Sequence, residues 1–166
     1  MRSTPPGGRP VLLFVACALA LLAVLLAARS IDRGDGAIPV PYTADPARTP
    51  GVLNPDVTQA TIGSTVCVRG WTRTVRPSSS YTSDLKLRQM REYGSTGAPS
   101  EYQEDHLISL ELGGHPTDPR NLWPEPRPRA EQVDQLENEL NDRVCDGSLS
   151  LADAQQRIRE VKFEKG

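Results

Sequence analysis

The residues of this chain that could do chemistry are concentrated between positions 104 and 123. Asp105 and His106 are adjacent, an apolar run ending in two glycines follows, and Asn121 lies fifteen residues after His106. A carboxylate can ligate a hard cation such as Mg²⁺, and an imidazole can accept a proton near neutral pH. The spacing therefore indicates a compact site for metal-assisted hydrolysis, built around one of only two histidines in the chain.

The Asp-His pair alone also has a simpler explanation. A single histidine is more often a hydrogen-bonded structural residue than a catalytic one. Adjacent residues of an extended segment point to opposite sides, so Asp105 and His106 share one site only where the backbone bends.

The longer pattern is more specific than the pair. It consists of Gly-Trp-Thr at 70–72, Arg-Pro at 76–77, Asp-His-Leu-Ile at 105–108, Leu-Glu-Leu-Gly-Gly at 110–114 and Asn-Leu-Trp-Pro at 121–124. This series resembles the core of the HNH endonucleases, a branch of the His-Me finger (ββα-metal) nucleases. The similarity extends from about Cys67 to Phe163.

The resemblance assigns a role to each residue of the motif. It implies that His106 is the general base, that Asp105 is a metal ligand, and that Asn121 braces the loop and keeps the histidine oriented. Gly113 and Gly114 would form the turn between two strands. The implied cofactor is a divalent ion, Mg²⁺ or Mn²⁺.

The chain departs from the family pattern at the third metal ligand, which is normally a His or Asn on the following helix. No histidine follows His115. Asp134 is the preferred candidate for this ligand, and Glu131 and Asn138 are the alternatives.

The charge of the chain limits how it could bind nucleic acid. Without the three arginines of residues 1–29, the remaining 16 basic and 21 acidic residues leave a net charge of −5, whereas a polyanion-binding domain usually carries a basic surface. We therefore expect weak, non-specific contact with nucleic acid, with Arg76 and Arg120 as the candidate phosphate ligands. The simpler expectations for the other notable residues are an exposed loop for His115, solvent for Glu104 and Glu111, and the core for Trp71 and Trp123.

The N-terminus carries an apolar run over residues 11–28, about 27 Å long as a helix and flanked by arginines. We expect residues 1–29 to be an uncleaved signal anchor, with a cleaved signal peptide as the alternative. Residues 30–51 are rich in proline and glycine and predict a linker without packed structure. Residues 52–166 would then form one domain outside the cytoplasm, membrane-anchored or secreted, for which we predict no protein partner.

Patterning within that domain predicts an α+β fold: a small His-Me finger domain with an extra strand and flanking helices. The expected elements are strands at 59–68 and 102–112, a chain return at 121–123, and helices at 85–93, 130–144 and 151–161. Ser83 is the expected N-cap of the first helix. Pro124, Pro126 and Pro128 argue against a continuous ladder or helix after the return, although Pro128 suits a first helical turn.

The two cysteines of this domain, Cys67 and Cys145, have no zinc-finger spacing. In an oxidising compartment they predict a disulfide, and two unlinked buried thiols are the alternative.

The sequence thus favours a metal-dependent nuclease that hydrolyses phosphodiester bonds in DNA or RNA. Two alternatives stay open. One is a degenerate nuclease fold that serves as a non-catalytic extracytoplasmic binding module. The other is a disulfide-stapled structural or interaction protein whose Asp-His pair makes only a buried hydrogen bond.

Overall fold

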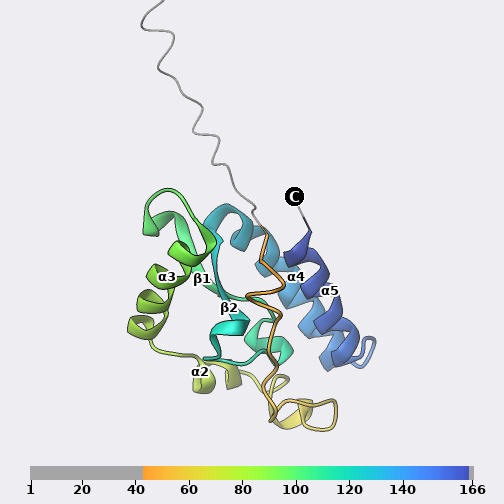
Figure 1. Ribbon diagram of the computed structural model, residues 1–166. Coiled ribbons are helices and arrows are strands. Elements are labelled where there is room, and N and C mark those ends of the chain that lie inside the picture. The colour runs from red at the N-terminus through yellow and green to blue at the C-terminus, as the bar shows by residue number, and fades with distance from the viewer. Residues whose placement is uncertain (1–42, 165–166) are drawn as a thin grey trace, which may run out of the picture. The chain divides into compact units, whose positions relative to one another are not determined.

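The computed structural model describes residues 43–164 (Figure 1). The predicted signal anchor at 1–29 and residues 30–42 of the predicted linker lie outside the described residues. None of the helices within 43–164 is long and apolar enough to cross a bilayer. This part of the chain is α+β, with four α-helices and one two-stranded sheet.

The sheet is an antiparallel pair of short strands, β1 (Tyr102–His106) and β2 (Leu122–Pro126). The return at 121–123 is therefore confirmed, but the expected strand over 102–112 is too long. After His106 the backbone leaves the ladder, because the Ile108 N–H donates to the side chain of Asn121. A 3₁₀ helix (Leu110–Leu112) then leads into the two glycines.

The prolines after the return do not prevent pairing, contrary to the prediction. Pro124 and Pro126 both lie within β2, opposite Glu104 and Tyr102. Residues two apart in a strand direct their N–H groups to the same side, so both prolines can face away from β1 and remove no ladder hydrogen bond.

Two helices pack against one side of this hairpin and follow their predicted spacing closely. Helix α4 (Arg127–Cys145) has Pro128 in its first turn, as expected. Helix α5 (Leu151–Phe163) begins at the predicted residue, and the hydroxyl of its N-cap, Ser150, accepts from the Asp153 N–H. Their apolar faces form the main core, which includes Val133, Leu140, Val144, Leu151, Ala154 and Ile158.

The other side of the hairpin is covered by α3 (Ser79–Tyr93), which follows the short α2 (Trp71–Val75) (Figure 1). Helix α3 starts four residues before the predicted N-cap at Ser83. Ser78 caps it by accepting from the Tyr81 N–H at 3.3 Å. Ser78 therefore caps the helix, and Ser79 and Ser80 lie in its first turn.

The predicted strand at 59–68 is wrong. This segment forms turns and a 3₁₀ helix (Ile62–Ser64). The Thr61 hydroxyl accepts from the Thr58 N–H at 2.8 Å and donates to the Asp56 carbonyl at 2.8 Å, and the Thr65 hydroxyl donates to the Thr61 carbonyl. Such local bonds compete with a ladder, and here they replace it.

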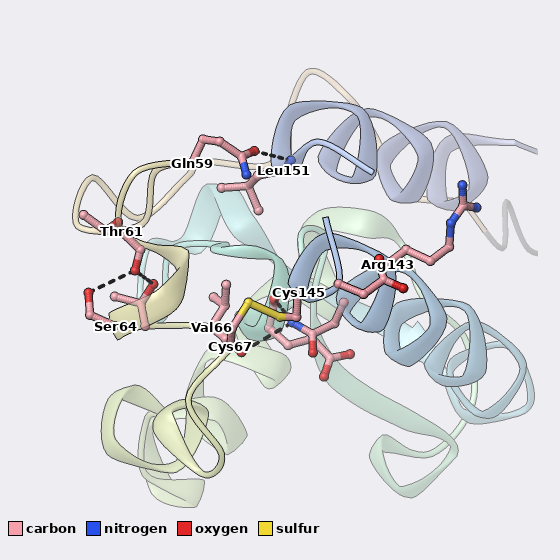
Figure 2. The surroundings of a disulfide bond; sticks show 12 residues. Gln59, Thr61, Ser64, Val66, Cys67, Arg143, Cys145 and Leu151 are labelled. Carbon is pink, nitrogen blue, oxygen red and sulfur yellow. Dashed lines mark hydrogen bonds between the residues drawn. A yellow bond between two sulfur atoms is a disulfide. The ribbon is translucent and has the colours of Figure 1, made fainter. Parts of the chain in front are cut away.

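The predicted disulfide between Cys67 and Cys145 is confirmed, with Cα atoms 5.5 Å apart (Figure 2). It ties the turn-rich segment to the end of α4. Close by, the Leu151 N–H donates to the side chain of Gln59 at 2.8 Å, so the same segment also contacts the start of α5.

Residues 43–51 are packed, which corrects the expectation of an unstructured linker over this part of 30–51. Thr49 is fully buried, and Ala44 packs with Leu107 and Trp123 in a second, smaller core cluster. The Ala44 N–H donates to the Lys162 carbonyl at 3.0 Å, which joins this segment to α5. The packed structure therefore begins before residue 52.

Candidate active site

His106 is the last residue of β1 and is held in one orientation. Its Nε2 lies 3.0 Å from the carbonyl oxygen of Pro116, and only 7% of the residue is exposed. A carbonyl oxygen only accepts, so Nε2 carries the proton and Nδ1 is the basic nitrogen of the neutral ring. Burial lowers the pKa of His106 below its usual 6.5, although the bond to Pro116 and the charge of Asp105 oppose this shift.

Asn121 braces the loop that carries Pro116. Its side chain is fully buried and saturated: Oδ1 accepts from the Ile108 N–H at 3.0 Å, and Nδ2 donates to the carbonyls of Ile108 and His115 at 3.1 and 3.0 Å. The bonds join the two ends of the loop that runs between the strands. Asn121 thus contacts the residue directly before the carbonyl that orients His106.

Gly114 permits this close approach. A Cβ at this position would lie 1.7 Å from the Ile108 carbonyl oxygen and 2.6 Å from the Asn121 amide nitrogen. The first glycine of the pair, Gly113, has a φ of +78°. The two glycines therefore serve different purposes, since one supplies a left-handed turn and the other supplies space.

Asp105 is paired with a lysine, Lys162, that was not among the predicted site residues. The Nζ of Lys162, on α5, lies 2.6 Å from Asp105 Oδ2, 2.7 Å from Glu137 Oε1 and 3.5 Å from Glu125 Oε2, and it donates to the His106 carbonyl at 2.7 Å. Lys162 and Glu125 are fully buried. The cluster joins both strands to α4 and α5.

The charges of this cluster are set by burial and by mutual attraction. Burial opposes ionisation of Asp105, but attraction to Lys162 outweighs it and holds the pKa of Asp105 well below its usual range. Burial also opposes the charge of Lys162, and the surrounding carboxylates more than offset it, so the pKa of Lys162 is raised. Burial raises the pKa of Glu125 to about 9 and that of Glu137 to about 7, against the attraction of Lys162.

The expected metal ligands are only partly brought together. Asp105 and Asp134 line one cavity of about 270 Å³ with His106, and Asn138 and Glu137 also line it. Glu131 does not line this cavity. Within residues 43–164, no three His, Cys, Asp or Glu side chains are placed so that they could jointly hold a metal ion. Because the Asp105 carboxylate is already paired with Lys162, the side chains as arranged do not fit a divalent ion there.

The two candidate phosphate ligands differ in their surroundings. Arg76 lines the same cavity as His106. Arg120 does not, and its guanidinium is bound to the Asp118 carboxylate at 2.7 and 3.0 Å. The structure thus brings Arg76 but not Arg120 to the histidine.

Glu104 is a second acidic residue beside the histidine, and the expectation that it is solvated is wrong. It lies two positions before His106 in β1, which places both side chains on one face of the strand. Both also line an adjoining cavity of about 440 Å³ with Arg76 and Thr82. The Glu104 carboxylate oxygens are buried without a hydrogen-bond partner, and burial raises the pKa of Glu104 to about 8.

The other simple expectations have mixed outcomes. Trp123 is in the smaller core cluster, as predicted, and Trp71 is partly buried against the main core. His115 lies in the loop but is half-buried, and its Nδ1 accepts from the N–H groups of Thr117 and Asp118. Glu111 is half-buried and lines the 270 Å³ cavity.

Lys162 and Glu137 were missed although helical spacing contains a signal for both. Lys162 lies four residues after Ile158, and Glu137 lies four after Val133, so each continues a buried face. A charged residue at such a position is an exception to normal burial, which calls for a partner of opposite charge.

Comparison of the chain with protein-family models, with curated proteins and with solved structures found no match.

Proposed function

We propose that this domain hydrolyses phosphodiester bonds in nucleic acid, with Nδ1 of His106 as the general base. The observation that carries the proposal is the hydrogen bond from Nε2 to the Pro116 carbonyl. It leaves Nδ1 as the proton acceptor of a ring that burial keeps neutral at pH 7. The motif resemblance supports the same assignment.

The remaining residues of the cavity suit a phosphodiester substrate. Arg76 can pair with a phosphate oxygen in a charge-assisted hydrogen bond. In the proposed reaction a water molecule attacks phosphorus and its proton passes to Nδ1 of His106. The bond from phosphorus to the leaving oxygen breaks, and that oxygen takes a proton from solvent. We further propose that residues 11–28 anchor the domain outside the cytoplasm. The disulfide agrees with an oxidising compartment.

The proposal is tested with plasmid DNA and single-stranded RNA, each incubated with Mg²⁺, with Mn²⁺ and with EDTA. His106→Ala should lower the cleavage rate by about 10²–10⁴-fold, the usual contribution of a general base. His115→Ala, which removes the only other histidine, should retain most of the rate. Equal cleavage by wild type and His106→Ala under every condition would show that the activity is contamination.

Arg76 and Arg120 provide a matched pair for substrate binding. Both are exposed arginines, but only Arg76 lines the cavity with His106. Arg76→Ala should raise KM or lower kcat/KM, whereas Arg120→Ala should change neither by more than about two-fold. Equal losses in the two variants would indicate a general surface charge effect in place of a specific contact.

One observation favours a second candidate, a non-catalytic binding module. The Asp105 carboxylate, which the resemblance assigns to a metal, is neutralised by Lys162. Under this alternative the domain binds nucleic acid or another extracytoplasmic ligand without cleaving it. Retained binding with no His106-dependent cleavage would favour this alternative.

A further inference from the structure

The Lys162 ammonium is surrounded by the kinds of atom that also ligate hard divalent cations. Its near neighbours are all oxygens: the carboxylates of Asp105, Glu137 and Glu125, and the backbone carbonyl of His106. Carboxylate and carbonyl oxygens from several elements are the normal ligands of Ca²⁺, and carboxylates also serve Mg²⁺ and Mn²⁺.

Each donor of the ammonium has a close oxygen partner in this environment. A lysine has three N–H donors, and three oxygens lie at 2.6–2.7 Å from Nζ, with the fourth at 3.5 Å. The side chain is fully buried and comes from α5, whereas Asp105 and His106 belong to β1. The ammonium of Lys162, which is part of the chain itself, offsets the free-energy cost of removing the Asp105 and Glu137 carboxylates from water.

A second cation would face this cluster at a disadvantage. Glu125 has a further positively charged neighbour, Arg129, with Nε 3.4 Å from its Oε1. A divalent ion at Asp105 would have to displace Lys162, and the ammonium would then be buried without its partners. An uncompensated buried charge costs several kcal/mol.

We infer that Lys162 is a built-in cation that takes the place of a divalent ion at Asp105. It closes the Asp105, Glu137 and Glu125 cluster in the folded protein. It also holds the end of β1 through the His106 carbonyl, so Lys162 acts as a positioning residue for the proposed base. The wild-type protein takes up no divalent ion at Asp105, and removing the ammonium while leaving its space open creates a site that does.

The test measures ion binding and unfolding on the full-length chain in mild detergent. Free Mn²⁺ is followed by electron paramagnetic resonance, and thermal unfolding is followed with and without Ca²⁺. Lys162→Ala removes the cation and leaves a space lined by oxygens, whereas Lys162→Met removes the charge but fills the space. Arg157→Ala, an exposed charge removal on the same helix, is the control.

The expected result has two parts. Wild type and Arg157→Ala should show no Mn²⁺ binding that depends on Asp105. Lys162→Ala should bind Mn²⁺ at least ten-fold more tightly than wild type, and Ca²⁺ should raise its unfolding temperature. Neither Lys162→Met nor the double variant Lys162→Ala with Asp105→Asn should gain this site.

Two results would overturn the inference. One is Mn²⁺ binding by wild type that is lost in Asp105→Asn. The other is a Lys162→Ala protein that gains no affinity, or that stays unfolded in Ca²⁺ and Mn²⁺. The inference concerns the site of the proposed function, but its test does not require cleavage. A protein inert towards DNA and RNA would refute the proposed function and leave the ion result standing.

Discussion

Replacing Glu104 should change how the stability of the protein depends on pH, because its carboxyl group is buried without a hydrogen-bond partner. Burial is the main cause that raises the pKa of Glu104 from 4.5 to about 8, and repulsion from Asp105 adds to it, while Lys86 and Arg88 oppose the shift. In the unfolded chain the group ionises near pH 4.5. The folded protein therefore binds this proton more tightly than the unfolded chain does.

The sign and the size of the effect follow from this difference. A group whose pKa is raised on folding favours the folded state below the unfolded pKa, and this contribution is lost as pH rises towards the folded pKa. At about 1.36 kcal/mol per unit of pKa, the contribution of Glu104 falls by about 3 kcal/mol between pH 5 and pH 7.5. About two thirds of the total loss, which is roughly 5 kcal/mol for a shift from 4.5 to about 8, lies in that window.

Glu104→Gln removes the ionisation and keeps the shape of the side chain. The variant should be close to wild type in stability at pH 5, where the folded carboxyl is protonated. At pH 7.5 it should be more stable than wild type by about 1–3 kcal/mol, after allowing about 1 kcal/mol for a buried amide that lacks partners. Urea unfolding at the two pH values measures both free energies of unfolding.

The decisive quantity is the difference between the two proteins as pH changes, since Glu125 and Glu137 also titrate and affect both proteins alike. Glu101→Gln, at an exposed position just before β1, is the control and should give a constant difference. If the Glu104→Gln difference is equally constant from pH 5 to pH 7.5, Glu104 titrates normally and the reasoning from burial is refuted.

Three further predictions concern the disulfide, the glycine turn and the base. Replacing both disulfide cysteines by serine should lower the free energy of unfolding by about 4–5 kcal/mol in the chain-entropy model for 78 residues of separation, and reduced wild type should match that variant in urea unfolding. Gly114→Ala should cost more than about 3 kcal/mol or prevent folding, because its Cβ would overlap the Ile108 carbonyl. Gly63→Ala, with no atom within 4 Å, should stay within about 1 kcal/mol of wild type. The midpoint of the acidic limb in the pH profile of kcat/KM should lie below pH 6.5, because burial lowers the pKa of His106. A midpoint above pH 7 would contradict the assignment of His106 as the base.

The helices and the hairpin could be predicted because each depends on a signal carried by neighbouring residues. In α4 the apolar positions Val133, Leu136, Leu140 and Val144 repeat at helical spacing, and Ser150 with Asp153 marks the start of α5. The disulfide was predictable for a different reason, since only one pair of cysteines lies in the predicted domain.

The features that could not be predicted depend on contacts between distant residues or on competition between local bonds. The β-branched residues of 59–68 favour a strand, but threonine hydroxyls satisfy the backbone locally. The pairing of Lys162 with Asp105 joins positions 57 residues apart. Spacing places Lys162 on a buried face, but only the fold determines which carboxylates surround it.

The orientation of His106 depends both on residues of the sequence motif and on contacts between distant residues. The Pro116 carbonyl that fixes His106 belongs to a loop, and a loop carbonyl can direct a side chain only if the loop itself has one conformation. Asn121 supplies that conformation by binding Ile108 and His115, and Gly114 allows the approach. The residues that the sequence presents as one motif therefore act in series: the glycine admits the asparagine, the asparagine fixes the loop, and the loop fixes the base. Lys162 holds the same histidine from the other end, through its backbone carbonyl.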